Sequence, residues 1–126
     1  MINDERDPET YALIGAAIEV YNQLGCGFVE LPYQLAFASE LELRGIPYER
    51  ELPIIVSYKG RTLACGYKAD FVCNGAVLVE LKVADEIIDK HRSQVINYLK
   101  ATGLNRALIL NFGKSRLEWE RVVLDF

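Results

Sequence analysis

Apolar and polar residues alternate through two consecutive stretches in the middle of the chain, residues 66–72 and 76–83. In the first stretch the charged residues Lys68 and Asp70 stand between apolar neighbours. In the second, apolar residues occupy every odd position: Val77, Val79, Leu81 and Val83. A period of two is typical of β-strands, and Asn74-Gly75 between the stretches is a strong signal for a tight turn. The two stretches are therefore predicted to form a β-hairpin.

The register of this hairpin decides which side chains share a face of the sheet. A two-residue loop at Asn74-Gly75 would pair Cys73 with Ala76. Asp70 and Glu80 would then point to opposite faces, and each face would mix apolar with charged side chains. A slip of one residue turns a whole strand over, so the hydrophobic pattern disfavours this register.

The favoured alternative is a three-residue loop over residues 73–75, or an equivalent bulge. This loop is expected to be a type I turn with Gly75 in the left-handed position, pairing Val72 with Ala76 and Asp70 with Leu78. The apolar residues then share one face of the hairpin. The other face collects four charged side chains: Lys68, Asp70, Glu80 and Lys82.

Helical spacing of apolar residues appears on both sides of the hairpin. Asp7-Pro8-Glu9 offers an N-cap, a proline at the first helical position and an acid in the first turn, and Gly25 is a natural stop. A second helix is predicted from residues 30–32 to Gly45, and a third over about 86–102.

Short alternating or continuous apolar runs predict the remaining strands. They cover residues 51–57, residue 62 onward to the hairpin turn, 105–112 and 117–124, with a turn at 58–61. With the helices, this gives one α/β domain over residues 1–126 in the order α-α-β-β-β-α-β-β. A chain of 126 residues has room for a single core.

Composition narrows the classes of function. The chain is 51% hydrophobic and 25% charged, with a net charge of −4, whereas nucleic-acid binders are usually basic. The balance weighs against tight, non-specific nucleic-acid binding by a monomer, although a local basic patch stays compatible with it. Three scattered cysteines without a C-x-x-C pair argue against zinc, an iron–sulfur cluster or a disulfide framework.

No apolar run approaches the length of a membrane span, so we expect no membrane association. The acidic, polar start of the chain is unlike a signal peptide. A cytoplasmic location is the expectation that follows.

The charged face of the hairpin is the first candidate for chemistry. Two carboxylates a few ångströms apart repel each other unless a cation joins them. Lys82 can serve as that cation in a purely structural ion pair. A hard ion such as Mg²⁺ or Mn²⁺, held by Asp70 and Glu80 and completed by waters and substrate phosphate, is the other interpretation. Residue chemistry leaves both open.

Helix positions add further candidates. Glu30 begins the second helix, where a carboxylate favours the helix dipole, so capping alone explains it as well as chemistry does. Gln94 and Tyr98 share a flank of the third helix, where Gln94 can hold the lysine or a phosphate; an exposed glutamine is the alternative. His91 has no evident second ligand and is expected to be a surface histidine.

Several motifs in this order resemble the GxxExxY proteins, a group within the PD-(D/E)XK nuclease superfamily. The signature itself matches Gly27-Phe28-Val29-Glu30-Leu31-Pro32-Tyr33, and Glu80-Leu81-Lys82 matches the E-x-K motif. The segment Tyr67-Lys68-Ala69-Asp70 also resembles this group. Gln94-x-x-x-Tyr98 resembles the third motif of RecB-like nucleases. The similarity runs from about residue 14 to residue 123.

The resemblance implies a PD-(D/E)XK-like core, a mixed β-sheet flanked by helices. It also implies a Mg²⁺ or Mn²⁺ ion bound by Asp70, Glu80 and the Leu81 main-chain carbonyl, with Glu30 reaching it directly or through water. Lys82 would position the attacking water or stabilise phosphate charge. Gln94 and Tyr98 would support the site, and Lys68 stands where arginine is more usual in the group.

The leading functional expectation is therefore a metal-dependent phosphodiesterase acting on DNA or RNA. The alternative is a non-catalytic interaction module that keeps the nuclease fold and works as a homodimer or with a protein partner. The acidic net charge, the small size and the lack of an appended DNA-binding segment motivate this alternative.

Overall fold

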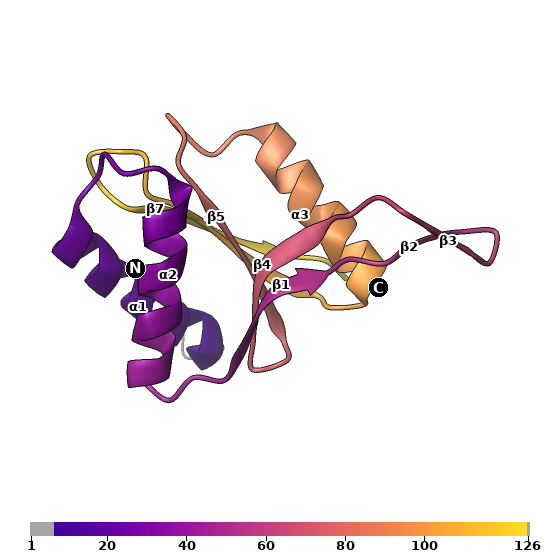
Figure 1. The fold of residues 1–126 in the computed structure, drawn as a ribbon, viewed down its shortest axis with the longest axis horizontal. Helices are drawn as coiled ribbons and strands as arrows, with labels where there is room; N and C mark the ends of the chain where they lie inside the picture. The colour runs from indigo at the N-terminus through magenta and orange to yellow at the C-terminus, as the bar shows by residue number, and fades with distance from the viewer. Residues whose placement is uncertain (1–6, 126) are drawn as a thin grey trace.

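A five-stranded mixed β-sheet in the order β1-β4-β5-β6-β7 lies at the centre of the computed structural model, which describes residues 7–125 (Figure 1). Strands β5 and β6 are parallel and the other neighbours are antiparallel. The strand bounds are β1 Tyr48–Pro53, β4 Lys68–Cys73, β5 Val77–Lys82, β6 Arg106–Asn111 and β7 Glu118–Val123. The predicted α/β class with a mixed sheet flanked by helices is confirmed.

Helices cover both faces of this sheet. Helices α1 (Pro8–Leu24) and α2 (Glu30–Leu43) pack on the face that carries Phe71 and Leu81. Helix α3 (Asp89–Thr102) packs on the opposite face, which carries Leu78. Burial of strands on both faces explains the nearly continuous apolar run of β6.

The predicted end signals of α1 are confirmed. The Asp7 side chain accepts a hydrogen bond from the Thr10 N–H at 3.2 Å, Pro8 is the first helical residue, and Gly25 ends the helix with φ +68°. Glycine takes this left-handed conformation without the cost that a Cβ would bring.

The hairpin between β4 and β5 has the predicted loop length but a different register. Cys73 pairs with Val77 and Val72 with Leu78, so the loop is Asn74–Ala76 and the predicted pairs Val72–Ala76 and Asp70–Leu78 are wrong. The predicted type I turn is wrong as well. Asn74 takes a left-handed φ of +57° beside Gly75 at +63°, giving a tight primed turn in which the Ala76 N–H donates to the Cys73 carbonyl at 3.0 Å.

This correction shifts the pairing by an even number of residues, so the shared face survives. Asp70 and Glu80 become the next opposed positions after Phe71 and Val79. That face is not purely charged, however, because Leu78 and Val72 also lie on it, buried in the cluster beneath α3.

Two long predicted strands are each divided. The prediction over 51–57 corresponds to β1 followed by β2 (Val56–Tyr58), and the strand predicted from residue 62 corresponds to β3 (Arg61–Leu63) followed by β4. Strands β2 and β3 form a separate two-stranded arm that projects from the body (Figure 1). Pro53, which has no N–H, ends β1, and Gly66 with φ +71° precedes β4.

Helix α3 begins three residues later than predicted. The segment before it bonds to the end of the sheet, since the Ile87 N–H donates to Glu118 Oε1 and Asn111 bonds both the N–H and the carbonyl of Ala84. These long-range bonds compete with a further helical turn.

Within residues 7–125, none of the helices combines the length and apolar character required to cross a bilayer. The first six residues, to which the signal-peptide expectation refers, lie outside the described part of the chain.

Candidate metal centre

The candidate site forms where β4 and β5 part beyond the hairpin. The Asp70 N–H donates to Glu80 Oε2 at 2.7 Å, and the Leu81 N–H donates to Asp70 Oδ2 at 2.8 Å. On the other side of β4, Glu51 has φ +57° and interrupts the pairing with β1 opposite Asp70. Each carboxylate thus binds a backbone N–H of the opposite strand, and the two acids are locked together at a break in the ladder.

Lys82, two residues beyond Glu80, is held between β5 and α3. Its Nζ lies 4.0 Å from Glu80 Oε1 and donates to Gln94 Oε1 at 2.7 Å. Gln94 Nε2 in turn donates to the Tyr98 hydroxyl at 3.4 Å. Four of the candidate residues therefore form one connected chain from the sheet to the helix.

Burial disfavours the ionised form of both carboxylates. Burial and, to a smaller extent, the negative charge of Asp70 raise the pKa of Glu80 to about 8. The hydrogen bond from the Asp70 N–H and the positive charge of Lys82 lower this pKa, but by less. Burial also raises the pKa of Asp70 to about 6, with the Leu81 N–H opposing and the Glu30 charge adding to the rise. The positive charges of Lys82 and Arg50 do not offset burial, so both acids are hard to ionise at neutral pH and the pair favours an additional cation.

The donor set fits a hard divalent ion. The two backbone hydrogen bonds engage Asp70 Oδ2 and Glu80 Oε2, so neither bond uses Asp70 Oδ1 or Glu80 Oε1. In residues 7–125, no three His, Cys, Asp or Glu side chains are grouped to hold a metal. Two carboxylates suffice for Mg²⁺ or Mn²⁺, which keep several waters and take further ligands from substrate phosphate.

Glu30 is the first residue of α2 and is exposed to solvent. Its charge raises the pKa of both Asp70 and Glu80, and its Oε1 accepts a hydrogen bond from Gln34 Nε2 at 3.1 Å. Glu30 thus acts electrostatically on the carboxylate pair without forming a three-acid cluster with it.

Tyr33 fixes the loop that leads to Glu30. Its ring is fully buried and stacks on Phe112 with centroids 4.6 Å apart. Its hydroxyl donates to the Gly25 carbonyl at 2.7 Å and accepts from the Phe28 N–H at 3.3 Å. The tyrosine of the G-x-x-E-x-x-Y segment is therefore a buried anchor that sets where α2 begins.

The remaining candidates lie nearby in different roles. The Lys68 Nζ lies 3.8 Å from Glu51 at the surface. His91 lies at the surface, partly buried, and its Nδ1 accepts from the Ile88 N–H at 3.2 Å. Burial and the nearby Lys82 lower its pKa. For Leu81, the group bonded within the site is the N–H rather than the carbonyl.

Arg50 belongs to this region and was missed by the sequence analysis. Its charge lowers the pKa of Asp70, its Nη2 donates to Gln34 Oε1 at 2.9 Å, and its Nε is buried without a hydrogen-bond partner among the described residues. The predicted strand began at residue 51, so Arg50 fell outside it. Extending the strand to Tyr48 would have placed Arg50 beside the hairpin.

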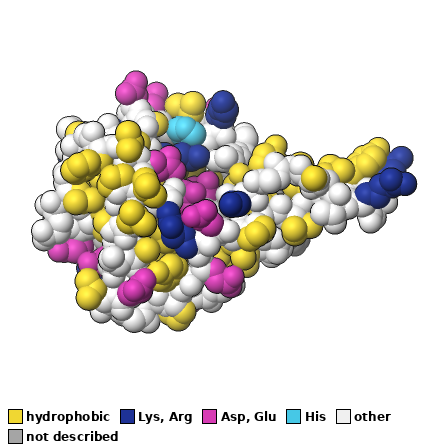
Figure 2. Space-filling model, viewed as in Figure 1, with side chains coloured by type: hydrophobic (Ala, Val, Ile, Leu, Met, Phe, Trp, Pro, Cys, Tyr) yellow, Lys and Arg dark blue, Asp and Glu magenta, His cyan; other side chains and the backbone are white. Residues whose placement is uncertain are grey.

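A basic hollow adjoins the carboxylates. It measures about 390 Å³ and is lined by Lys82, Lys90 and His91 together with Ile88 and Gln94. Figure 2 shows acidic and basic side chains side by side below the cyan histidine, between the helical body and the arm. The negative charge of the carboxylate pair thus lies next to positive charge suited to a phosphate.

A family model described as the PD-(D/E)XK nuclease superfamily matches residues 7–122, nearly the whole described chain. No curated protein and no solved structure is significantly similar to the chain. Nucleases of this superfamily are typically dependent on divalent metals. The match includes both strands that carry the acids and the helix that contacts Lys82. The chain therefore belongs to the PD-(D/E)XK nuclease superfamily.

Proposed function

We propose that the protein is a Mg²⁺- or Mn²⁺-dependent phosphodiesterase that cleaves DNA or RNA, and that it belongs to the GxxExxY group of its superfamily. The observation that carries the proposal is the reciprocal bonding of Asp70 and Glu80 at the strand break, with Lys82 within 4.0 Å of Glu80. A purely structural ion pair needs no second acid with a raised pKa.

Asp70 and Glu80 would hold the ion, with the Leu81 main-chain carbonyl as a further ligand and Glu30 acting directly or through water. The bound ion supplies Lewis acidity toward the phosphoryl oxygen and lowers the pKa of the attacking water. Lys82, fixed by Gln94, orients that water or stabilises charge on the phosphate. Tyr98 holds Gln94, so both are positioning residues.

The basic hollow accounts for substrate binding by an acidic chain. The described residues that line it include Lys82 and Lys90 and no acid, so a phosphate meets positive charge there although the net charge is −4. Local complementarity steers a charged ligand even where the whole molecule repels it.

A cleavage assay with Glu80→Gln tests the proposal. Single- and double-stranded DNA and RNA are incubated with Mg²⁺, Mn²⁺ or EDTA. We expect metal-dependent cleavage by the wild type and a loss of about 100-fold or more in the variant, since it removes an essential electrostatic group. Glu19→Gln on α1 is the matched control and should cleave normally. Equal cleavage by wild type and Glu80→Gln would mean a contaminating nuclease.

The alternative function is a non-catalytic interaction module, as a homodimer or within a complex. Exposed apolar side chains around the start of α2 favour it: Phe28, Val29, Leu31 and Leu35. Calorimetry separates the two functions. Mn²⁺ binding that Asp70→Ala abolishes supports the enzyme, whereas no Mn²⁺ binding by the wild type supports the module.

A further inference from the structure

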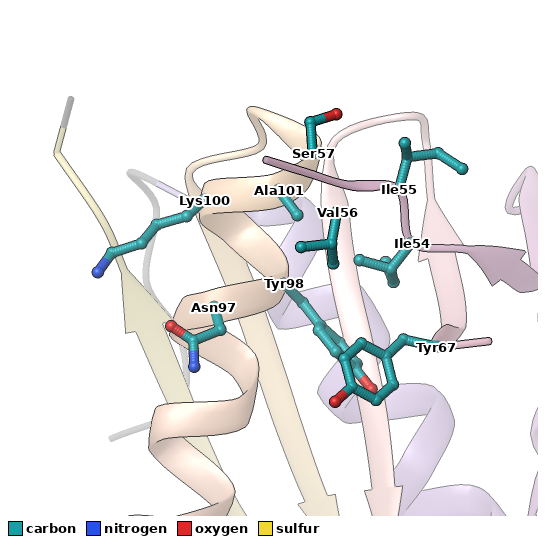
Figure 3. A pocket seen from close by; sticks show the side chains of 9 residues that line it. All are labelled: Ile54, Ile55, Val56, Ser57, Tyr67, Asn97, Tyr98, Lys100 and Ala101. Carbon is teal, nitrogen blue, oxygen red and sulfur yellow. The ribbon is translucent and has the colours of Figure 1, made fainter. Parts of the chain in front are cut away.

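A cavity of about 500 Å³ lies at the root of the arm, between α3 on one side and the start of β2 and the residues next to the arm on the other (Figure 3). One side is apolar and consists of residues 54–56. Tyr67 and Tyr98 close one end, and Asn97 contributes an amide from α3. Volumes of about 300–1,000 Å³ with apolar walls and a few polar groups are typical of small-ligand sites.

The two tyrosines offer an aromatic platform. Their ring centroids are 6.0 Å apart at an interplanar angle of 41°, and Figure 3 shows them next to each other at the end of the cavity. Tyr98 is buried, whereas Tyr67 is 50% exposed. A half-exposed aromatic ring at a cavity wall can stack on the face of any nucleobase.

A series of hollows with shared lining residues runs along α3 between the cavity and the candidate metal centre. A smaller hollow of about 220 Å³ is lined by Gln94 together with Tyr67, Asn97 and Tyr98. Gln94 also lines the basic hollow beside Lys82, and the other three line the cavity. Three adjoining hollows therefore lead from the proposed site of cleavage to the root of the arm.

The segment of residues 54–67, which contains the arm, has a net positive charge, whereas the chain as a whole is acidic. Residues 54–67 include Lys59 and Arg61 and no acid, in a chain of net charge −4. Both basic residues are exposed, and Figure 2 shows dark blue side chains at the tip of the arm. At about 3.3 Å per strand residue, the tip lies roughly 10 Å beyond the cavity, within reach of neighbouring phosphates of a bound strand.

We propose that this cavity receives an unpaired nucleobase of the substrate, with the basic tip of the arm contacting the phosphates that follow it. A base inside an intact duplex has both faces stacked and its edge paired, so it cannot enter such a cavity without being extruded. Because extrusion costs energy that an unpaired base does not require, the favoured substrate is a single strand or an unpaired end. This inference rests on the proposed function and specifies its substrate class.

Binding to a short fluorescein-labelled oligothymidylate, followed by fluorescence anisotropy in EDTA, tests the proposal. We expect the wild type to bind this strand more tightly than a blunt duplex of equal length. Tyr67→Leu should weaken binding to the single strand on the order of 10-fold, because it removes one stacking interaction. Tyr67→Phe should bind like the wild type, because it keeps the ring.

Tyr11→Leu is the matched control, since Tyr11 is 39% exposed on α1, on the other side of the sheet. Equal affinities for Tyr67→Leu and Tyr11→Leu would overturn the proposal, as would a wild type that binds the duplex as tightly as the single strand. Sedimentation checks for a second copy in the cavity. A wild-type dimer that Tyr67→Leu dissociates would also overturn it.

The arm is tested by salt dependence. The double variant Lys59→Ala and Arg61→Ala should reduce the slope of log affinity against log salt by about 1.4, because each neutralised phosphate of a single strand contributes about 0.7. Arg116→Ala is the control for a charge lost elsewhere, since Arg116 is exposed and lines a hollow beside α1. This variant should change the salt slope less than the double variant does. Equal slopes in wild type and double variant would count against the arm.

Failure of this inference is separable from failure of the proposed function, because binding is measured without metal. Single-strand binding that depends on Tyr67, without any cleavage, would retain the base site and refute the phosphodiesterase. Cleavage of duplex and single strand at equal rates, unaffected by Tyr67→Leu, would support the phosphodiesterase and refute the base site.

Discussion

At the scale of single residues, the pairing of Asp70 with Glu80 depends on backbone as much as on charge. Each carboxylate accepts an N–H that strand pairing would otherwise use. Both acids are therefore held in place by the backbone. Fixed ligands bind and stabilise charge better than mobile ones, because no ordering cost remains to be met on binding.

Lys82→Met separates chemistry from structure at this site. We expect cleavage to fall by on the order of 10²–10³-fold, since a positioned cation is lost, while Mn²⁺ still binds because Asp70 and Glu80 remain. Cleavage assays and calorimetry on the same preparation measure the two effects. A variant that loses stability but keeps cleavage and Mn²⁺ affinity would show that Lys82 serves only as a structural ion pair.

At the scale of elements, the start of α2 is fixed by the buried Tyr33 rather than by a side-chain cap. The N-cap residue Val29 makes no side-chain capping bond, and the Tyr33 hydroxyl instead bridges Gly25 and Phe28. The position of Glu30 thus depends on a hydroxyl three residues further along the helix.

Tyr33→Phe tests this dependence. Loss of the hydroxyl leaves the Gly25 carbonyl without its donor, so we expect about 1–2 kcal/mol of lost stability and several-fold lower cleavage as Glu30 shifts. Urea unfolding and the cleavage assay measure the two. Tyr21→Phe is a close control, since the Tyr21 hydroxyl donates to the Lys114 carbonyl away from the carboxylates. It should cost stability and leave cleavage unchanged.

The elements themselves were largely predictable, and the misses have local causes. The apolar pattern of residues 51–57 predicts extended structure, but it does not say which strand each part pairs with. The division of this segment between β1 and the arm therefore could not be predicted. The prediction that Asp70 and Glu80 share a face of the sheet was correct, because the observed register differs from the predicted one by an even number of residues. The register itself was not predicted, because it depends on Asn74 taking a left-handed φ, a choice that leaves the hydrophobic pattern unchanged.

At the scale of the whole molecule, long-range contacts were beyond the reach of sequence patterns. Arg50 joins the site because β1 pairs with β4 across a separation of about twenty residues, and Tyr67 meets Tyr98 because the segment between the arm and β4 lies against α3. Local periodicity predicts which face a side chain takes, whereas tertiary packing decides what it meets there.

Asp7 shows the same principle for stability. It caps α1, yet it also accepts hydrogen bonds from Arg106 of β6 at 2.7 Å and Arg121 of β7 at 2.6 Å. Burial pushes its pKa upward, but the bonds from Thr10 and Arg121 outweigh burial and hold the pKa below its ordinary value of 3.8. One buried carboxylate thus ties the first helix to the far edge of the sheet.

Asp7→Asn should therefore destabilise the protein by about 3 kcal/mol at neutral pH, since two arginines lose a buried partner. Because the folded pKa of Asp7 is lowered, its contribution is complete above the unfolded value of 3.8 and is lost as the pH falls through the lower folded value. The difference between wild type and variant in urea unfolding should be constant above about pH 5 and shrink in stronger acid. Glu9→Gln, which removes a more exposed partner of Arg106, should cost under about 1 kcal/mol. A difference that does not change down to the lowest pH at which the protein folds would mean that the Asp7 charge contributes nothing beyond its cap.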